Sequence, residues 1–384
     1  MTALDPSRTI QPVVGVARLS PYIPGKPVET LEREYGVQNA VKVASNENPL
    51  GPSSEVVAHL AKMLENPLEL ARYPDGNGFI LKDKLIEHLK PTLTKLTAEQ
   101  ITLGNGSNDV LDILARTFAG PGDEVIFSQY AFAVYPIATQ AVGATAVVTP
   151  AVNWGHDLTA MLDAVTDKTR LIFIANPNNP TGTCLSGDEL VNFIKQVPEH
   201  IVVVVDEAYE EYAVHKNSGF SEQYYSMLSK VSEFPNLVVT RTFSKAYGLA
   251  SFRVGYAISS EYIADLLNRV RQPFNNNAFA LECAAIALDD QSHIQRSVEL
   301  NWQGMALLIQ GFQKLGLDYI PSAGNFVCVK TGPNSADIYE QLLYKGVIVR
   351  PVSNYQMPEY LRISIGNAEE NNRVLEALSM ILNQ

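Results

Sequence analysis

Short apolar runs alternate with stretches of helical hydrophobic spacing through the middle of the chain. The runs Leu171–Ala175, Ile201–Val205 and Leu237–Val239 lack the polar alternation of a half-exposed strand, which is typical of strands buried on both faces. Helical spacing is present at Leu81–Leu89 and Val110–Phe118. This alternation predicts an α/β domain over residues 53–275, with a mostly parallel sheet sandwiched by helices.

The pattern changes beyond about residue 275. Two long helical stretches come first, and strand-like segments then flank a further helix. The expected helices are 278–288, 294–315 and 335–345, and the expected strands are 325–329, 347–350 and 360–365. This order predicts a smaller α+β domain over residues 276–384.

The first 52 residues have little periodicity. Three prolines fall within Pro21–Pro27, and they exclude a helix there because proline lacks the amide donor and fixes φ. An extended N-terminal arm is therefore expected over residues 1–52, contributing a segment to the smaller domain. The stretch Asn46–Pro52 predicts a polar turn.

Composition narrows the class of protein. Hydrophobic residues make up 46% and charged residues 18% of the 384 residues, as in ordinary globular proteins. A formal net charge of -12 argues against nucleic-acid binding. Three widely spaced cysteines and a start without a signal-peptide core favour a cytoplasmic protein. The scattered histidines predict no metal site, and no apolar run is long enough to cross a membrane.

Polar side chains follow each of the three buried runs. The segments are Asn176–Gly182, Asp206–Tyr209 and Thr240–Gly248. Open parallel sheets bind ligands at the carboxyl ends of their strands. Together with Arg253, these segments offer a lysine, a carboxylate, a phenol, an amide, a hydroxyl and a guanidinium. That set matches what the cofactor pyridoxal 5'-phosphate needs from a protein.

Each of these groups has a chemical role that suits the cofactor. Lys245 can bond covalently to the cofactor aldehyde and then move a proton. Asp206 can pair with the protonated pyridine nitrogen, which keeps the ring able to withdraw electrons. Tyr209 and Asn179 can hydrogen-bond the phenolic oxygen of the ring. Lys245, Asp206 and Tyr209 are therefore the catalytic candidates.

The cofactor phosphate needs amide donors and positive charge. Gly106, Ser107 and Asn108 open a predicted helix, whose first turn offers backbone N–H groups and the positive end of its dipole. Ser244 adds a hydroxyl and Arg253 a guanidinium. A dinucleotide-binding loop is disfavoured here, because the third glycine of its pattern is missing.

An aromatic ring is also expected to stack on the pyridine face. Phe132 is the preferred candidate within the segment Tyr130–Tyr135. Spacing alone does not separate Phe132 from Tyr130, so both stay open.

With these motifs in hand, the chain resembles the fold-type I pyridoxal-phosphate aminotransferases, and within them the histidinol-phosphate aminotransferase branch. The resemblance covers nearly the whole chain and is carried by Asn-Pro-Thr-Gly at 179–182, Asp-Glu-Ala-Tyr at 206–209 and Thr-Phe-Ser-Lys at 242–245. It implies transfer of an amino group between histidinol phosphate and 2-oxoglutarate or glutamate in histidine biosynthesis.

The resemblance also implies residue roles that the motifs alone do not. Arg362 corresponds to the arginine that grips the substrate carboxylate, and Arg350 and Tyr22 correspond to further substrate contacts. Tyr73 corresponds to a tyrosine that reaches the cofactor phosphate of the neighbouring subunit, which implies a homodimer. Phe132 corresponds to the stacking aromatic when the segment is aligned through Gly143.

Other functions remain alternatives at this point. An aminotransferase for phenylalanine or tyrosine would use the same residues, and a phosphothreonine decarboxylase is a related branch with similar arginines. A nicotinamide dehydrogenase and a binding module without catalysis are disfavoured by Lys245, Asp206 and Arg253.

Overall fold

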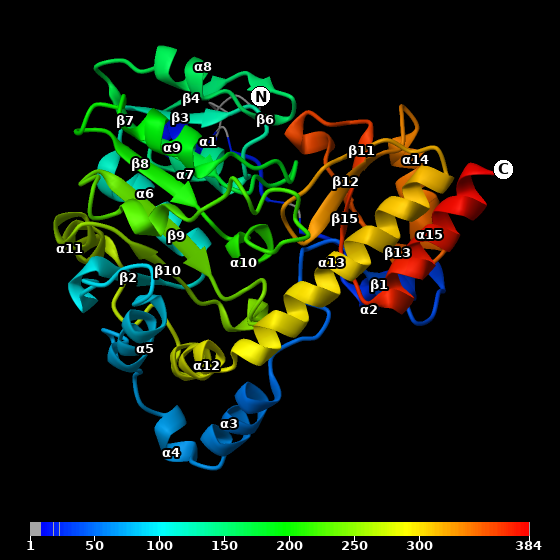
Figure 1. Cartoon of the computed structure of the whole chain (residues 1–384), viewed down its shortest axis with the longest axis horizontal. Helices are drawn as coiled ribbons and strands as arrows, with labels where there is room; N and C mark the ends of the chain where they lie inside the picture. The colour runs from blue at the N-terminus through cyan, green and yellow to red at the C-terminus, as the bar shows by residue number, and fades with distance from the viewer. Residues whose placement is uncertain (1–8, 18, 23, 384) are drawn as a thin grey trace.

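A seven-stranded sheet forms the centre of the larger part of the molecule (Figure 1). The computed structural model describes residues 9–17, 19–22 and 24–383, so the first eight residues of the predicted arm lie outside it. The strands of this sheet are β2 (Ile101–Gly104), β3 (Glu124–Ser128), β4 (Thr145–Thr149), β7 (Thr169–Ala175), β8 (Val202–Asp206), β9 (Leu237–Thr242) and β10 (Gly255–Ile258). Their order is β2-β10-β9-β8-β7-β3-β4. Only β10 runs antiparallel to its neighbours, so the predicted mostly parallel sheet is confirmed.

Helices cover both faces of this sheet. The helices of the larger part are α3 (Ser54–Leu64), α4 (Pro67–Leu70), α5 (Phe79–Leu89), α6 (Ser107–Phe118), α7 (Val134–Ala141), α8 (Leu158–Asp163), α9 (Gly187–Ile194), α10 (Glu210–Ala213), α11 (Glu261–Val270), η1 (Ala98–Gln100), η2 (Met227–Lys230) and η3 (Ala250–Phe252). In β8, Val202 and Val204 belong to a buried cluster that includes residues of α6 and α11, whereas Val203 and Val205 belong to another that includes residues of α5 and α9. Burial on both faces explains why the strand has no polar alternation.

A smaller antiparallel sheet forms the second part. Its strands are β11 (Tyr319–Ile320), β12 (Phe326–Lys330), β14 (Arg350–Pro351) and β15 (Tyr360–Ser364), in the order β11-β12-β15-β14. Helices α14 (Ser335–Tyr344), α15 (Ala368–Leu382) and η4 (Ser353–Tyr355) belong to this part. The predicted strand at 347–350 is divided in two, because β13 (Val347–Ile348) pairs with β1 (Val41–Lys42) while β14 pairs with β15.

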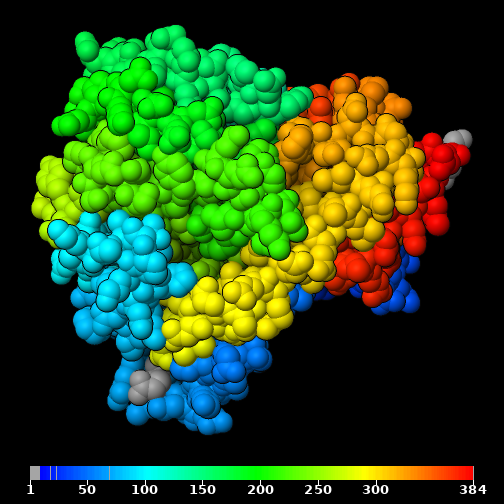
Figure 2. Space-filling model, viewed as in Figure 1, coloured from blue at the N-terminus to red at the C-terminus, as the bar shows by residue number. Residues whose placement is uncertain are grey.

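Two helices connect the parts. Helix α12 (Ala278–Asp289) packs against α3 and α5, and the long α13 (Gln291–Lys314) runs from there to α15 and the small sheet (Figure 1). The space-filling view shows α12 wedged between the α5 segment and the α3–α4 segment (Figure 2). The domain boundaries at residues 52 and 275 stay predictions, and the packing of α12 places residues 278–289 against α3 and α5 of the larger part.

The N-terminal segment is less extended than predicted. The proline-rich stretch is not helical where it is described, but α1 (Val14–Ala17) precedes it and α2 (Val28–Tyr35) follows it. Helix α2 begins directly after its N-cap residue Pro27, whose backbone is extended, with φ of -66° and ψ of 150°. The hairpin of β5 (Ala151–Val152) and β6 (Gly155–His156) completes the described elements.

Candidate active site

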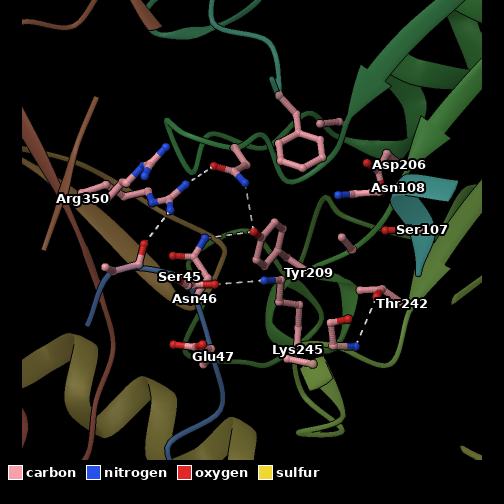
Figure 3. A pocket seen from close by; sticks show the side chains of 18 of the residues that line it. Ser45, Asn46, Glu47, Ser107, Asn108, Asp206, Tyr209, Thr242, Lys245 and Arg350 are labelled. Atoms are coloured by element: carbon pink, nitrogen blue, oxygen red, sulfur yellow. Dashed lines mark hydrogen bonds between the residues drawn. The ribbon is translucent and has the colours of Figure 1, made fainter. Parts of the chain in front are cut away.

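A cavity of about 250 Å³ opens where β7, β8 and β9 end. Ala175 pairs with Asp206, and Asp206 pairs with Thr240, so the three strand ends lie side by side. The cavity contains most of the predicted cofactor and substrate residues (Figure 3): Tyr22, Ser107, Asn108, Phe132, Asn179, Asp206, Tyr209, Ser244, Lys245, Arg253, Arg350 and Arg362.

Lys245 lies in the loop after β9 and faces this cavity (Figure 3). Its amine donates a hydrogen bond to the backbone oxygen of Ser45, at 3.2 Å. Burial lowers the pKa of Lys245 to about 8, and the charge of Arg362 acts in the same direction. A substantial fraction of the amine is therefore neutral near physiological pH, as a nucleophile and proton carrier requires.

Asp206 is the last residue of β8 and is 4% exposed. Its two carboxylate oxygens accept hydrogen bonds from Thr240 Oγ1 and from Tyr135 OH, each at 3.0 Å. Burial raises the pKa of Asp206, and these two hydrogen bonds oppose that rise. Both donors are neutral, so the carboxylate has an unmet preference for a cation at the cavity face.

Tyr209 and Asn179 are joined directly. The Asn179 amide nitrogen donates to the Tyr209 hydroxyl at 3.1 Å, and the Asn46 amide nitrogen donates to the same oxygen at 3.0 Å (Figure 3). Burial raises the pKa of Tyr209 to about 12. The phenol therefore stays protonated near neutral pH and can donate a hydrogen bond.

The predicted phosphate residues gather at the other end of the cavity. Gly106 lies directly beneath the Arg253 guanidinium, since an added Cβ there would stand 2.5 Å from Arg253 Nη2. Gly106 also has φ of 85°, which favours glycine. Ser107 begins helix α6, and the Ser244 hydroxyl accepts a hydrogen bond from Arg253 at 3.4 Å. Helix dipole, amides and guanidinium thus converge at one point, as anion binding requires.

Two arginines of the small sheet complete the cavity. Arg362 is 6% exposed, and its Nη atoms donate to Asn179 Oδ1 and to the Ala44 backbone oxygen. Its Nε is buried without a hydrogen-bond partner among the described residues. Arg350 pairs with Arg362 in the β14–β15 register and lies 5.4 Å from the Tyr22 ring centroid. Arg350 lies on the opposite side of the cavity from Asp206 (Figure 3), so the two arginines bring positive charge to that side.

The structure separates the two candidate stacking residues. Phe132 lines the cavity and meets Tyr135 edge-on, with ring centroids 5.9 Å apart. Tyr130 instead packs on Trp154, at 5.1 Å, in a different apolar cluster. This placement favours Phe132, whose role on the cofactor stays a prediction.

Tyr73 lies outside the cavity of its own chain. It is 82% exposed and stacks on Phe274, with ring centroids 4.7 Å apart. The chain alone therefore does not bring Tyr73 to the predicted phosphate site, and its predicted role depends on a second subunit.

Several residues of the site were not predicted from sequence. Tyr135 and Thr240 hold Asp206, Asn46 bonds to Tyr209, and Glu47 and Tyr355 line the cavity. Tyr135 had only the pattern of a core aromatic. Asn46 had a weak signal, since one residue separates its polar turn from the segment Val41–Ala44, which is apolar except for Lys42.

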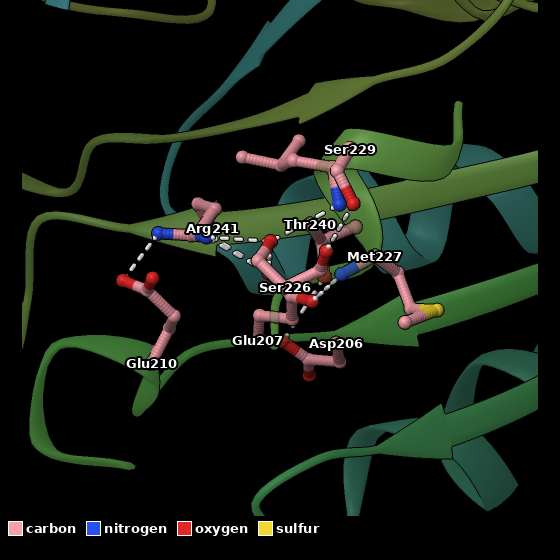
Figure 4. Close-up of polar contacts among 9 residues, drawn as sticks. Asp206, Glu207, Glu210, Ser226, Met227, Ser229, Thr240 and Arg241 are labelled. Carbon is pink, nitrogen blue, oxygen red and sulfur yellow. Dashed lines mark hydrogen bonds and ion pairs between the residues drawn. The ribbon is translucent and has the colours of Figure 1, made fainter. Parts of the chain in front are cut away.

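A second polar cluster lies behind the site (Figure 4). Arg241 donates to Glu207, to Glu210 and to Ser226, with distances between 2.7 and 3.0 Å. Glu207 also accepts hydrogen bonds from Ser226 Oγ and the Met227 amide. Glu207 and Arg241 directly follow Asp206 and Thr240, so strand alternation turns them to the opposite face.

Within the described residues, no helix is long and apolar enough to traverse a bilayer. No group of three His, Cys, Asp or Glu side chains in that part of the chain is placed to hold a metal ion.

Comparisons with known proteins agree with this geometry. The sequence profile of the family described as aminotransferase class I and II matches residues 38–378. The chain is 54% identical over 367 residues to histidinol-phosphate aminotransferase 1 of Idiomarina loihiensis, covering 96% of each chain. It is 50% identical over 383 residues to histidinol-phosphate aminotransferase 1 of Mannheimia succiniciproducens, covering 100% of each.

Solved structures give the same result. The crystal structure of histidinol-phosphate aminotransferase from Sinorhizobium meliloti, in complex with pyridoxal-5'-phosphate, superposes with a TM-score of 0.87 at 26% identity, covering 98% of this chain and 99% of that one. An aspartate aminotransferase double mutant from Thermus thermophilus shares the fold, with a TM-score of 0.81 at 22% identity and coverage of 96% and 98%.

Proposed function

This chain belongs to the class I and II aminotransferase family, and from that premise we propose that it is a histidinol-phosphate aminotransferase. It transfers an amino group between histidinol phosphate and 2-oxoglutarate or glutamate, with pyridoxal 5'-phosphate as cofactor. The relatives that support this substrate are at least half identical to the chain and align over nearly their full length. The observation that carries the proposal is one cavity holding Lys245, Asp206 and the paired arginines Arg350 and Arg362.

The cavity fits pyridoxal phosphate at three separate points. The side chains that donate to Asp206 among the described residues are neutral, and a protonated ring nitrogen would add a cationic donor. Because Gly106 has no side chain, the Arg253 guanidinium lies close to the backbone amides at the start of α6, and a phosphate could bind both. Tyr209 carries a protonated hydroxyl suited to a phenolic oxygen. Lys245 lies among these three groups and is placed to hold the cofactor aldehyde.

The arginine pair suits two substrates that carry different anions. Histidinol phosphate has a phosphate and no carboxylate, whereas glutamate has carboxylates and no phosphate. A guanidinium binds either anion bidentately. Arg362 lines the cavity, and one N–H of each Nη is bonded to the protein, which leaves each Nη a second N–H for an incoming anion.

The chain's own residues account for the proton movements. When bound, pyridoxal phosphate supplies an electron sink for the carbon that bears the amino group. Lys245 Nζ, with its pKa of about 8, takes the proton from that carbon and later returns it. Asp206 holds the ring nitrogen in its protonated form, and Tyr209 donates to the phenolic oxygen. Arg362 and Arg350 orient the substrate through its anion.

An amino-donor panel with 2-oxoglutarate as acceptor tests the substrate. We expect histidinol phosphate to have the highest kcat/KM, followed by phenylalanine and tyrosine, with no carbon dioxide released from phosphothreonine. Preference for phenylalanine or tyrosine would identify an aromatic aminotransferase, and carbon dioxide release would identify a decarboxylase.

A homodimer with shared sites is part of the proposal. Tyr73 and Phe274 form an exposed aromatic pair, and Leu64, Leu68 and Ile80 are exposed on the neighbouring helices. An exposed apolar patch of this kind is typical of a subunit interface. Sedimentation equilibrium is expected to give twice the chain mass, and Tyr73→Phe is expected to weaken cofactor binding without dissociating the dimer.

A cytoplasmic location is also proposed. The three cysteines are free thiols, as a reducing compartment requires. Fractionation of cells that express the protein is the direct test.

A further inference from the structure

The segment 44–46 runs between the small sheet and the lysine. Its backbone oxygens accept hydrogen bonds from both sides: Ala44 O from Arg362 Nη2 at 2.9 Å, and Ser45 O from Lys245 Nζ at 3.2 Å. Asn46 follows them and points its side chain toward Tyr209 (Figure 3). The segment therefore contacts the substrate arginine, the lysine and the phenol within three residues.

Asn46 is held rigidly. It is 1% exposed and adopts φ of 55°, a left-handed conformation that asparagine tolerates better than most residues. Its backbone N–H donates to Ser364 Oγ at 2.7 Å, and its backbone oxygen accepts from Asn325 Nδ2 at 3.0 Å. Asn325 directly precedes β12 of the smaller sheet, and Ser364 lies on β15 of that sheet, as does Arg362.

These contacts also orient the Asn46 amide. The Ser364 hydroxyl accepts the Asn46 N–H and donates its own proton to Asn46 Oδ1, at 2.9 Å. The amide nitrogen of Asn46 therefore faces the Tyr209 hydroxyl, at 3.0 Å.

The second donor to Tyr209 is fixed in the same way. The Arg362 guanidinium can only donate, so the atom of Asn179 that it contacts must be the oxygen. The amide nitrogen of Asn179 therefore also faces the Tyr209 hydroxyl, at 3.1 Å. Two amide donors occupy both lone pairs of the Tyr209 oxygen. The hydroxyl proton must then point elsewhere, and Tyr209 lines the cavity.

We propose that Asn46 is a positioning residue that directs the Tyr209 proton to the phenolic oxygen of the cofactor. A hydrogen bond to that oxygen stabilises its anion and lowers the basicity of the Lys245 nitrogen bonded to the cofactor. Asn46 also connects the Tyr209 hydroxyl to β15, because its side-chain amide is held by Ser364, two residues after Arg362 on that strand. The inference rests on the proposed function, since it supposes that pyridoxal phosphate is bound.

The test is a pH titration of the visible absorbance of the cofactor-loaded protein, which reports protonation of the lysine nitrogen. Asn46→Gly removes the amide and keeps the left-handed backbone without strain. We expect the midpoint to rise by about half a pH unit in this variant, and by about one unit in Tyr209→Phe, where the donor itself is lost. In the Tyr209→Phe background, Asn46→Gly is expected to cause no further shift.

A second variant guards against loss of packing. Asn46→Asp has the same shape and tolerates the same φ, but its carboxylate accepts the Tyr209 proton instead of donating. Its midpoint is expected to rise at least as far as that of Asn46→Gly. The matched control is Asn371→Ala. This variant removes a buried amide of α15 that is hydrogen-bonded to the backbone of Gly366, and it is expected to leave the midpoint unchanged.

Two outcomes overturn the inference alone. In the first, the absorbance of the wild-type protein titrates and both Asn46 variants have the same midpoint as wild type. In the second, Asn46→Gly shifts the midpoint equally in the wild-type and Tyr209→Phe backgrounds. A wild-type protein that forms no visible band with pyridoxal phosphate overturns the proposed function, and this inference with it.

Discussion

Two polar clusters lie back to back where β8 and β9 end, and their sequences interleave. Asp206 lines the cavity and accepts a hydrogen bond from Thr240, whereas Glu207 and Arg241, one residue later along the chain in each case, pair with each other behind it. The rear cluster is closed: Arg241 contacts two carboxylates, and Glu207 has further donors. In the front cluster, the side chains that donate to Asp206 are the neutral Tyr135 and Thr240, and Arg362 Nε has no hydrogen-bond partner among the described residues.

The difference shows how to separate a site from a structural ion-pair network. Both clusters are buried, and burial raises the pKa of a carboxyl group in each, Asp206 in front and Glu207 behind, so a raised pKa alone does not distinguish them. Hydrogen-bonding capacity that is left unmet at a cavity does distinguish the two clusters. The front cluster needs a ligand to supply its remaining partners, whereas the residues of the rear cluster pair with one another. Substitutions in the front cluster should therefore lower kcat, and substitutions in the rear cluster should lower the free energy of unfolding.

The largest effect is expected for Lys245→Ala. Loss of the covalent anchor and of the proton carrier should lower kcat by at least about 10⁴-fold. The visible absorbance of the bound cofactor should disappear, while the thermal midpoint of the cofactor-free protein stays the same or rises, because a buried amine is removed. Transaminase assays and absorbance spectra measure both. Appreciable activity in this variant would refute the assignment of Lys245.

The adjacent carboxylates provide the sharpest test of the comparison. Asp206→Asn should lower kcat by about 10²-fold or more, because the ring nitrogen loses its anion, with little loss of stability. Glu207→Gln should leave kcat within a few-fold and lower the free energy of unfolding, because Arg241 loses a buried partner. The two isosteric variants are compared by kcat and by urea unfolding. If both lost activity equally, the division into a front and a rear cluster would be wrong.

Arg241→Met tests the rear cluster from its cationic side. Glu207, 1% exposed, would lose its countercharge, so a loss of about 3–5 kcal/mol in the free energy of unfolding is expected. The control is Arg269→Met, which breaks an exposed pair with Asp265 and should cost less than about 1 kcal/mol. Similar losses for both arginines would show that the rear cluster contributes little.

Sequence alone predicted most of the front cluster and little of what supports it. Lys245, Asp206, Asn179 and Tyr209 were predictable because each lies in a local motif after a strand, and parallel strands bring their ends together. Asn46 was not, because its contacts with Tyr209 and Ser364 span 163 and 318 residues. The predicted interface role of Tyr73 depends on a second chain.

For the fold, too, local features were predictable from sequence and contacts between distant segments were not. The buried strands and long helices were predictable from hydrophobic periodicity, which is a local property. Helix α2 was missed because its eight residues follow a proline-rich stretch. The division of residues 347–351 between two sheets was missed because the partners, β1 and β15, are distant in sequence.

The smallest expected effect concerns Glu211, which lies beside the rear cluster and lines a second cavity together with Glu210 and Arg241. Burial, followed by the nearby charge of Glu210, raises the pKa of Glu211 to about 8. The folded protein thus holds a proton that the unfolded chain loses near its ordinary pKa of 4.5. The stability from this group is complete at low pH and is lost as the pH rises through about 8.

Glu211→Gln stays neutral at every pH and should therefore raise the thermal midpoint at pH 9 while changing it little at pH 4.5. Calorimetry of the cofactor-free protein at both pH values measures the difference. Glu376→Gln, at an exposed position of α15, makes the same change of charge and should show no such pH dependence. A rear cluster that fully compensates its charges would give equal midpoints for Glu211→Gln and wild type at pH 9. Glu211 would then belong to the closed network around Arg241 and not to its margin.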